Sequence, residues 1–270
     1  MRTLGLSRAA RADYAALPAE TKAILEAYAS GVNAWIAARG RFAAPEFLVF
    51  GAPEPWQPAD SLLWAPAMGN YLSGNWRAEL TRLSLAGRLP RNLIDELWRS
   101  DPPRLHTERA ADPALAATAT RLAAVLPTFP GPWTQPESAS NEWAVDGRHS
   151  ATGAPILAGD PHLAFGFPGV WYLARIDTPD ETLAGATAPG VPFLLLGHNR
   201  SIAWTFTTTD ADVQDVFIEG PGEPLTSRTE RIRVRGQPDD VLTVRESRHG
   251  PIISDMMGIP GKILAVSMAN

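Results

Sequence analysis

The stretch that divides this chain into two kinds of structure is Ser138-Ala139-Ser140-Asn141-Glu142-Trp143-Ala144-Val145. It ends a run from Pro127 to Ser138, P-T-F-P-G-P-W-T-Q-P-E-S, that contains four prolines and one glycine. Proline interrupts helices and cannot donate to the ladder of a central strand, so we expect this run to be an exposed connector. The residues from Glu142 onward favour a strand. The stretch therefore predicts a serine, Ser140, where a connector passes into a strand.

The residues before this stretch are predicted to be helical. Between Pro18 and Gly40 apolar residues recur at helical spacing, and the flanking proline and glycine are start and stop signals. Three further helical regions are predicted: one after Asp60 that is broken near Pro66 and ends at about Ala86, one over Leu93–Trp98 with Asn92 as N-cap, and one over Pro113–Leu126.

Short runs of β-branched, aromatic and aliphatic residues follow Ser140, separated by Gly, Pro, Asn and Asp. Seven such runs at short spacing predict antiparallel sheet: Glu142–Val145, Pro155–Ala158, Val170–Ile176, Thr182–Ala186, Phe193–Leu196, Ile202–Thr207 and Val213–Ile218. Helices in the first half and strands in the second indicate the α+β class.

Composition excludes several kinds of function. With 270 residues and 45% hydrophobic content, the chain can bury one large core or two modest ones. A net charge of -5 without a block of Lys or Arg argues against nucleic acid or an anionic membrane surface as the main partner. The absence of cysteine excludes disulfides and thiolate metal sites. No stretch approaches the ~20 apolar residues of a transmembrane helix, and the first residues lack the apolar core of a signal peptide.

Ser140 is the candidate nucleophile. A serine hydroxyl needs a neighbouring base to take its proton during attack. If the chain is cut before Ser140, the freed α-amine, with an ordinary pKa near ~8, supplies that base on the same residue. The alternative is that Ser140 is an ordinary polar residue leading into a strand.

A resemblance to a known family rests on longer sequence motifs. They are S-N-E-W-A-V-D-G from Ser140, S-A-T-G-A-P-I-L-A-G-D-P-H-L from Ser150, and the run from Pro189 to Glu219 that includes G-H-N-R-S-I-A-W-T-F-T-T-T-D. Upstream words are A-Y-A-S-G-V-N-A-W-I, P-E-F, P-W-Q-P-A-D-S and S-G-N-W-R-A-E-L. Their order and spacing resemble the penicillin acylase family of N-terminal-nucleophile hydrolases over nearly the whole chain. The resemblance implies the αββα fold of that family, two stacked antiparallel sheets between helical layers, here incomplete.

The resemblance also implies an organisation of the chain. Residues 1–126 correspond to a helical α-subunit region, 127–139 to a spacer that ends at the cleavage site, and 140–270 to the N-terminal part of a β-subunit. An α/β heterodimer from one precursor is implied, in a periplasmic or secreted location. Because family enzymes are much longer, we interpret the chain as a fragment of such a precursor.

The catalytic roles follow from the same resemblance. Ala139-Ser140 is the implied autoproteolysis site, although the family usually has Gly where Ala139 stands. His162 is the residue that orients the nucleophile, or alternatively a structural histidine in an Asp-Pro turn. The backbone N–H of Thr208 or Thr209 is one oxyanion donor. The second donor, an asparagine, is expected downstream of residue 270. Asn199 is interpreted as a turn residue first and as a site residue second.

The resemblance further implies a structural Ca²⁺ held by Glu79, Asp212, Asp215 and the carbonyl of Gln214, since oxygen ligands suit a hard cation. Solvated acids are the alternative. Substrate pocket candidates share a small or apolar character and favour an apolar acyl group, although core packing explains the leucines equally well: Leu163, Leu196, Phe206, Gly69 and Ser73.

These residues predict a self-processing amidohydrolase that cleaves an N-acyl amide bond through an acyl-enzyme on Ser140, without a catalytic cofactor. The small-molecule substrate would be a β-lactam side chain, an acyl-homoserine lactone or a related acyl amide. No G-x-S-x-G or H-E-x-x-H motif supports a triad hydrolase or a zinc hydrolase. A catalytically incompetent fragment or a binding module that keeps the acylase scaffold stays open as the alternative.

Overall fold

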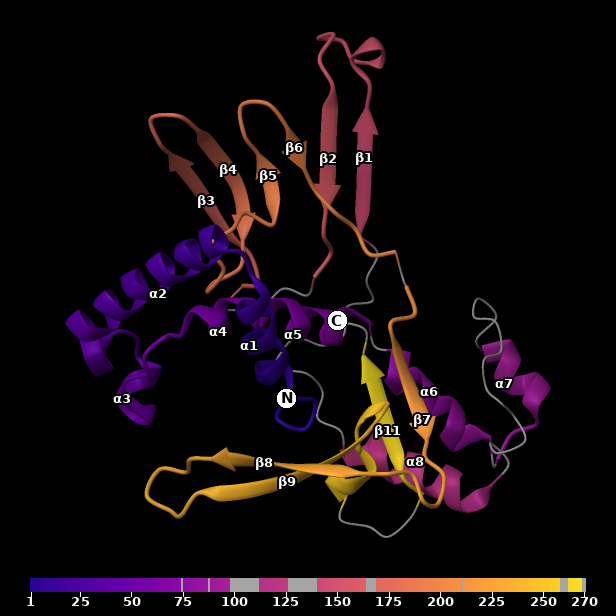
Figure 1. Ribbon diagram of the computed structural model, residues 1–270. Coiled ribbons are helices and arrows are strands. Elements are labelled where there is room, and N and C mark those ends of the chain that lie inside the picture. Colours follow the sequence, from indigo (N-terminus) through magenta and orange to yellow (C-terminus); the bar gives the residue numbers. More distant parts are fainter. Residues whose placement is uncertain are drawn as a thin grey trace. The chain divides into compact units, whose positions relative to one another are not determined.

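The computed structural model describes residues 1–73, 75–86, 88–97, 112–125, 140–163, 169–209, 211–257 and 262–268. Helices occupy the first half of the described chain and antiparallel strands the second (Figure 1), which confirms the predicted α+β class. The chain divides into two compact units. Unit 1 comprises Met1–Gly5, Asn70–Thr128 and Asp210–Asn270, and unit 2 comprises Leu6–Gly69 and Phe129–Thr209. Each unit therefore draws on both halves of the sequence.

The helices match the predicted ranges where the helical spacing of apolar residues is strongest. The elements are α1 (Leu6–Ala16), α2 (Ala19–Arg39), η1 (Gly40–Phe42), α3 (Glu46–Phe50), α4 (Pro58–Leu62), α5 (Trp64–Ser73), α6 (Asn75–Leu85), α7 (Arg91–Leu97) and α8 (Pro113–Val125). Helices α2 and α8 match their predicted ranges closely. Helix α1 was not predicted, because its buried apolar residues are only Leu6 and Ala10.

The predicted break near Pro66 is confirmed, whereas the predicted N-cap Asn92 was wrong. The chain breaks between α4 and α5 at Leu63, and Pro66 lies in the first turn of α5, where the missing N–H has no helical partner to lose. Asn92 is not an N-cap but the second residue of α7. Helix α7 starts earlier because the backbone N–H groups of Leu93 and Ile94 donate to the carbonyl of Pro90.

The strands of unit 2 form two antiparallel sheets. The hairpin of β1 (Asn141–Val145) and β2 (Ile156–Asp160), with η2 (Gly147–His149) between them, is one. The other has the order β3-β4-β5-β6 and contains β3 (Tyr172–Asp177), β4 (Thr182–Thr187), β5 (Leu196–His198) and β6 (Ala203–Trp204).

Two predicted strands in this unit were misplaced. The run Phe193–Leu196 is mostly a connection, because Thr187 Oγ1 donates to the carbonyl of Val191 at 2.9 Å and holds the chain in a turn; β5 starts only at Leu196. The strand predicted over Ile202–Thr207 shortens to β6. It starts late because Asn199 Oδ1 accepts from the N–H groups of Ser201 and Ile202, which confirms Asn199 as a turn residue.

Unit 1 holds the remaining strands, which also form two antiparallel sheets. The pair β7 (Gln214–Ile218) and β11 (Leu264–Met268) is one, and β10-β9-β8 is the other, with β8 (Thr226–Ile232), β9 (Asp240–Ser247) and β10 (Gly250–Pro251). A short η3 (Ser254–Met257) precedes β11. Among the residues described, no helix is long and apolar enough to cross a membrane.

The core of unit 1 combines side chains from both sides of the connector. Helices α6 and α8 supply six residues and the later segments three, all at most 4% exposed: Trp76, Leu80, Leu83, Leu115, Ala119, Leu122, Ile253, Leu264 and Val266. Burial of each large apolar side chain contributes about 1.5–3 kcal/mol. The helical segment and the strand segment therefore depend on each other for a core.

Unit 2 contains a comparable link between the two segments. Asn33 on α2 holds the backbone of Trp56 by two hydrogen bonds, of 2.9 Å and 2.7 Å. Gly190, in the connection between β4 and β5, has φ of 94° and faces the Trp56 indole, which a Cβ on residue 190 would approach to 3.0 Å. Glycine is therefore required there on two grounds, the positive φ and the close ring.

A buried acid organises the turn between β9 and β10 in unit 1. Glu219, with 3% of its side chain exposed, accepts hydrogen bonds from the Ser247 hydroxyl and from His249 Nδ1, the latter at 2.9 Å. The His249 ring also stacks on Phe217, with 3.9 Å between ring centroids. Burial alone would raise the pKa of Glu219, but the hydrogen bonds from Ser247 and His249 outweigh it and hold the pKa below its ordinary value of 4.5.

Replacement of this acid should weaken the fold in a pH-dependent way. Because the folded-state pKa is lowered, the ionised carboxylate stabilises the fold fully above pH 4.5, and this contribution is lost as pH falls through the lowered pKa. Glu219→Gln should therefore lower the free energy of unfolding at pH 7 by about 1–3 kcal/mol and reduce the loss of stability on acidification. Urea unfolding between pH 7 and pH 3 measures both effects.

Glu223→Gln is the matched control, since Glu223 lies 3.5 Å from the exposed guanidinium of Arg248. It should change the free energy of unfolding by at most about 1 kcal/mol. Equal stability of wild type and Glu219→Gln at pH 7 would contradict the role given to Glu219.

Candidate active site

Ser140 lies beside His162 because of the register of one hairpin. In the pairing of β1 with β2, Asn141 stands opposite Asp160, so the residue before β1 meets the residues after β2. The backbone N–H of His162 donates to Ser140 Oγ at 3.3 Å. The serine predicted as nucleophile and the histidine predicted to orient it are thus brought together, although the sequence separates them by the whole hairpin.

Asp160 holds the histidine ring. Its Oδ2 lies 2.6 Å from His162 Nε2. Since an ionised carboxylate only accepts hydrogen bonds, Nε2 is the donor in this contact. The side chains of His162 and Asp160 are 44% and 63% exposed. Sequence reasoning missed Asp160, and the signal for it was its place two residues before His162 in D-P-H.

The predicted oxyanion donors lie in the same unit, on the segment that follows β6. Thr208 and Thr209 are exposed and follow β6, but they do not end a strand as predicted, because β6 stops at Trp204. The side chain of Asn199, in contrast, already accepts the N–H groups of Ser201 and Ile202 within its turn. Ala139, the other residue of the predicted cleavage site, lies outside the described residues.

The pocket candidates are distributed over both units. Leu163 and Leu196 are half-buried, Phe206 is exposed, and Gly69 is exposed on α5; these residues belong to unit 2. Ser73, half-buried at the end of α5, belongs to unit 1. Their shared role in a substrate pocket stays a prediction.

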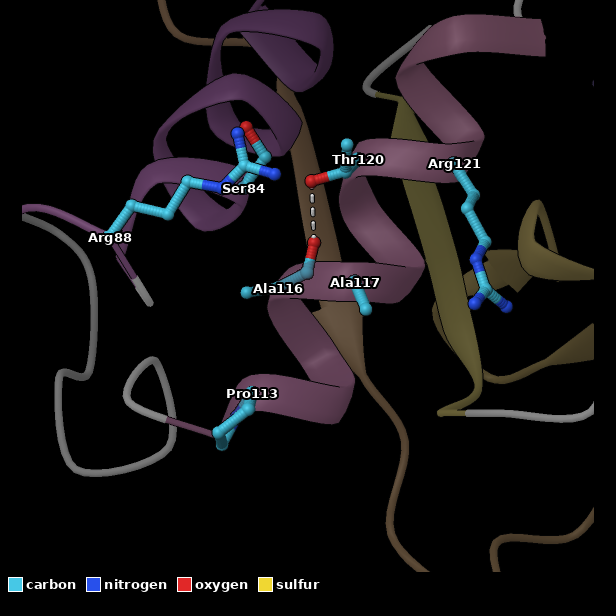
Figure 2. A pocket seen from close by; sticks show the side chains of 7 residues that line it. All are labelled: Ser84, Arg88, Pro113, Ala116, Ala117, Thr120 and Arg121. Carbon is cyan, nitrogen blue, oxygen red and sulfur yellow. Dashed lines mark hydrogen bonds between the residues drawn. The ribbon is translucent and has the colours of Figure 1, made fainter.

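One surface cavity of unit 1 contains none of these candidates. It has a volume of about 350 Å³ and lies between α6 and α8 (Figure 2), where it is lined by Ser84, Arg88, Pro113, Ala116, Ala117, Thr120 and Arg121. The hydroxyls of Thr120 and Ser84 donate to carbonyls of their own helices, at 2.9 Å and 2.7 Å, so neither is directed at a ligand. We assign no part of the active site to this cavity.

Three of the predicted metal ligands meet in unit 1. Carboxylate oxygens of Glu79 on α6, Asp212 before β7 and Asp215 on β7 all lie within 4.8 Å of one another. Glu79 Oε2 accepts from the N–H of Val216 at 2.6 Å, and Asp212 Oδ1 accepts from Asn75 Nδ2 at 3.0 Å. These hydrogen bonds hold one oxygen of Glu79 and one of Asp212 in place. The fourth candidate, Gln214, starts β7, and its side chain is buried beside Met268.

The electrostatics of this cluster fit a hard cation. Burial, with the neighbouring charges of Asp215 and Asp212, raises the pKa of Glu79 from 4.5 to about 7, against the opposing effects of the Val216 N–H and Arg82. Three close carboxylates repel one another in the absence of a counter-charge. Oxygen ligands of this kind suit Ca²⁺ and would be neutralised by it.

The raised pKa of Glu79 predicts a loss of stability at alkaline pH when no cation is bound. Because the folded-state pKa lies above 4.5, protonated Glu79 stabilises the fold below that pH, and this contribution is lost as pH rises through about 7. Glu79→Gln cannot ionise and should remove this dependence. Melting temperatures of both proteins in chelator between pH 5 and pH 8.5 measure the difference.

Asp95→Asn serves as the control, since Asp95 is 46% exposed on α7 and pairs with Arg91 away from the cluster. It should keep the wild-type trend. A wild-type melting temperature that rises from pH 5 to pH 8.5 in chelator would contradict the repulsion between the three acids.

Comparisons with known proteins agree over almost the whole chain. The penicillin amidase family model matches residues 1–269. Penicillin acylase 2 proenzyme of Pseudomonas sp. (strain SE83) is 32% identical over 94% of this chain and 35% of its own length. The acyl-homoserine lactone acylase QuiP of Pseudomonas aeruginosa is 29% identical over 98% of this chain and 34% of its own length.

A solved structure, the thermostable penicillin G acylase from Alcaligenes faecalis, matches with a TM-score of 0.41 and 24% identity, over 48% of this chain and 26% of that one. The chain spans about a third of the length of the two curated relatives.

Proposed function

This chain belongs to the penicillin amidase family, and we propose that it supplies the nucleophile of a self-processing amidohydrolase that cleaves N-acyl amide bonds through an acyl-enzyme on Ser140. The observation that carries the proposal is the Ser140 hydroxyl at the start of β1, 3.3 Å from the N–H of His162. Asp160 in turn orients the His162 ring. Covalent catalysis requires an activated nucleophile, and His162 and Asp160 would help to position Ser140 and its α-amine.

Self-processing would proceed at the bond between Ala139 and Ser140. Ser140 Oγ attacks the carbonyl carbon of Ala139 and passes its proton to the departing amide nitrogen, so that a C–O bond replaces the C–N bond. Water then hydrolyses the ester and leaves a carboxylate on Ala139 and a free α-amine on Ser140. The small side chain of Ala139 leaves this carbonyl accessible.

Turnover of the substrate uses the same hydroxyl. The α-amine of Ser140, with an ordinary pKa near ~8, takes the hydroxyl proton while Oγ attacks the acyl carbonyl, and the proton passes to the leaving amine. Water then releases the acyl group from the ester. The backbone N–H of Thr208 or Thr209 would stabilise the oxyanion, with a second donor supplied by the rest of the enzyme. His162 would hold the amine and its water in place, so its loss should slow turnover rather than abolish it.

The two products of cleavage would stay together as a heterodimer. Segment 1–126 supplies α6 and α8 to the core of unit 1, and segment 140–270 supplies Ile253, Leu264 and Val266 to the same core. Separation of the two would expose this apolar surface to water, which is unfavourable. The precursor therefore yields an α-subunit and a β-subunit that share their cores.

A structural Ca²⁺ is the second part of the proposal. Glu79, Asp212 and Asp215 would hold the ion through their carboxylates. The backbone carbonyl of Gln214 would be the fourth ligand. Glu79 comes from the proposed α-subunit and the other three from the β-subunit, so the ion would tie the two chains together. It would supply charge neutralisation and no catalytic step.

The substrate class follows from the relatives and from the apolar candidates. Relatives named for penicillins and for acyl-homoserine lactones both release an acyl group from an amide, and Leu163, Leu196 and Phe206 suit an apolar acyl chain, with Gly69 and Ser73 as the small residues. We also propose a periplasmic or secreted location for the enzyme.

Ser140→Ala in the full gene product should abolish both cleavage and amidase activity, because one hydroxyl serves both reactions. Intact mass measurement should find two chains in wild type, the second starting at Ser140, and one uncut chain in the variant. Hydrolysis of a penicillin and of an N-acyl homoserine lactone provides the activity measurement.

Ser138→Ala is the control, since Ser138 is the neighbouring hydroxyl, and it should be cut and active. Cleavage or amidase activity that survives in Ser140→Ala would point to another nucleophile. A wild-type protein that stays uncut and inactive would favour a binding module built on the acylase scaffold.

Calcium should stabilise the protein through the three acids. Saturation at about 100 times the dissociation constant raises the free energy of unfolding by about 2.7 kcal/mol, so the melting temperature at pH 8 should rise on addition of Ca²⁺ and fall with chelator. Glu79→Gln should show a much smaller rise. Mg²⁺ at the same concentration is the control for ionic strength, and an equal rise in wild type and Glu79→Gln would contradict the site.

A further inference from the structure

Thr205, the residue after β6, occupies the place where Gly159 on β2 would carry a side chain. A Cβ built on Gly159 would lie 1.9 Å from Thr205 Oγ1, 2.6 Å from its Cβ and 2.8 Å from its Cγ2. Real Cβ atoms essentially never approach other heavy atoms below 3.0 Å. The whole Thr205 side chain therefore fills the space that the missing side chain of residue 159 leaves.

Glycine is not required at position 159 by its backbone. Gly159 lies within β2, pairs with Glu142 in the ordinary antiparallel register and is not among the glycines with positive φ. Glycine inside a strand often marks the close approach of another segment. The requirement at this position is thus steric and comes from Thr205.

Within the described part of the chain, the hydroxyl of Thr205 forms no contact that would account for a threonine at this position. Its oxygen is buried, and no described residue forms a hydrogen bond with it. An unsatisfied buried hydroxyl costs about 1–3 kcal/mol, so a hydrogen bond is not what Thr205 contributes. Its contribution is the volume and shape of its side chain.

This contact joins the two segments that carry the proposed chemistry. Gly159 directly precedes Asp160, which contacts the ring of His162, and the backbone N–H of His162 donates to Ser140 Oγ. Thr205 leads directly into the segment that holds Thr208. Strands β2 and β6 lie next to each other in unit 2 but belong to different sheets, so their ladders do not fix their spacing (Figure 1).

We propose that Gly159 and Thr205 are a matched positioning pair, whose packing sets the distance between the nucleophile segment at Ser140 and the oxyanion donor segment at Thr208 and Thr209. This inference rests on the proposed function. Neither residue touches the reacting atoms; each acts through the segment that it positions.

Attack of Ser140 on the Ala139 carbonyl passes through an oxyanion that the same donors would stabilise, so self-cleavage reports on their position. The test measures the rate of precursor cleavage in the full gene product, by intact mass over time, at a temperature where every variant is fully folded. Gly159→Ala should slow cleavage by at least about 10-fold, because a displacement of about 1 Å can reduce a rate about 100-fold. Thr205→Gly removes the obstructing side chain. The double variant Gly159→Ala/Thr205→Gly should therefore be cleaved as fast as Thr205→Gly alone, which shows coupling between the two positions.

Thr205→Val is the matched control for shape. It keeps the branched side chain and removes the unpartnered hydroxyl, so it should be cleaved at the wild-type rate and melt no lower than wild type. Cleavage of fully folded Gly159→Ala at the wild-type rate would overturn the proposal, even if its melting temperature falls. A double variant as slow as Gly159→Ala would overturn it too.

Failure of the proposed function gives a different pattern. Wild type and all variants would then stay uncut. Failure of the positioning pair leaves wild type and Gly159→Ala cut alike, and Ser140→Ala uncut.

Discussion

The register of β1 on β2 is the constraint on which the candidate active site depends. Asn141 stands opposite Asp160, and this single choice places Ser140 beside the backbone N–H of His162. Side chains alternate along a strand, so a shift of one residue would send the Asp160 carboxylate to the opposite face of the hairpin. His162, two residues further along the same segment, would move with it, and Ser140 would lose its contact with the backbone N–H of His162. The same register sets Gly159, rather than a residue with a side chain, against Thr205.

The second constraint is that the two halves of the sequence share their cores. Helix α6 packs against β7, and α8 packs against η3, so neither the helical nor the strand segment of unit 1 buries its apolar surface alone. The Trp56 indole under Gly190 makes a similar link in unit 2. A cut at Ser140 would therefore divide the chain without dividing either unit. This property is what a precursor needs if it is to be activated by cleavage and remain folded.

Prediction from the sequence succeeded where local patterns were strong. The apolar spacing of α2, the alanine-rich α8 and the strand runs of β1, β4 and β7 are each set by neighbours within one element. It failed where other segments decide the outcome. The run at Phe193 is apolar enough for a strand, yet it follows a turn that the side chain of Thr187 holds at Val191, and β5 starts only at Leu196. Helix α1 has only two large apolar residues, Leu6 and Tyr14, and depends on what buries Leu6 and Ala10.

By itself, the sequence determined the order of helix and strand on the two sides of a proline-rich run. It also predicted Ser140 as nucleophile and base, and its family resemblance predicted roles for His162 and the acids Glu79, Asp212 and Asp215. Only the tertiary structure decided that the N–H of His162 lies beside Ser140 Oγ, that the three acids meet within 4.8 Å, and that Thr205 fills the space above Gly159. The reason is physical: a residue's neighbours in the chain set its local conformation, whereas strand register and close packing set its contacts with distant residues.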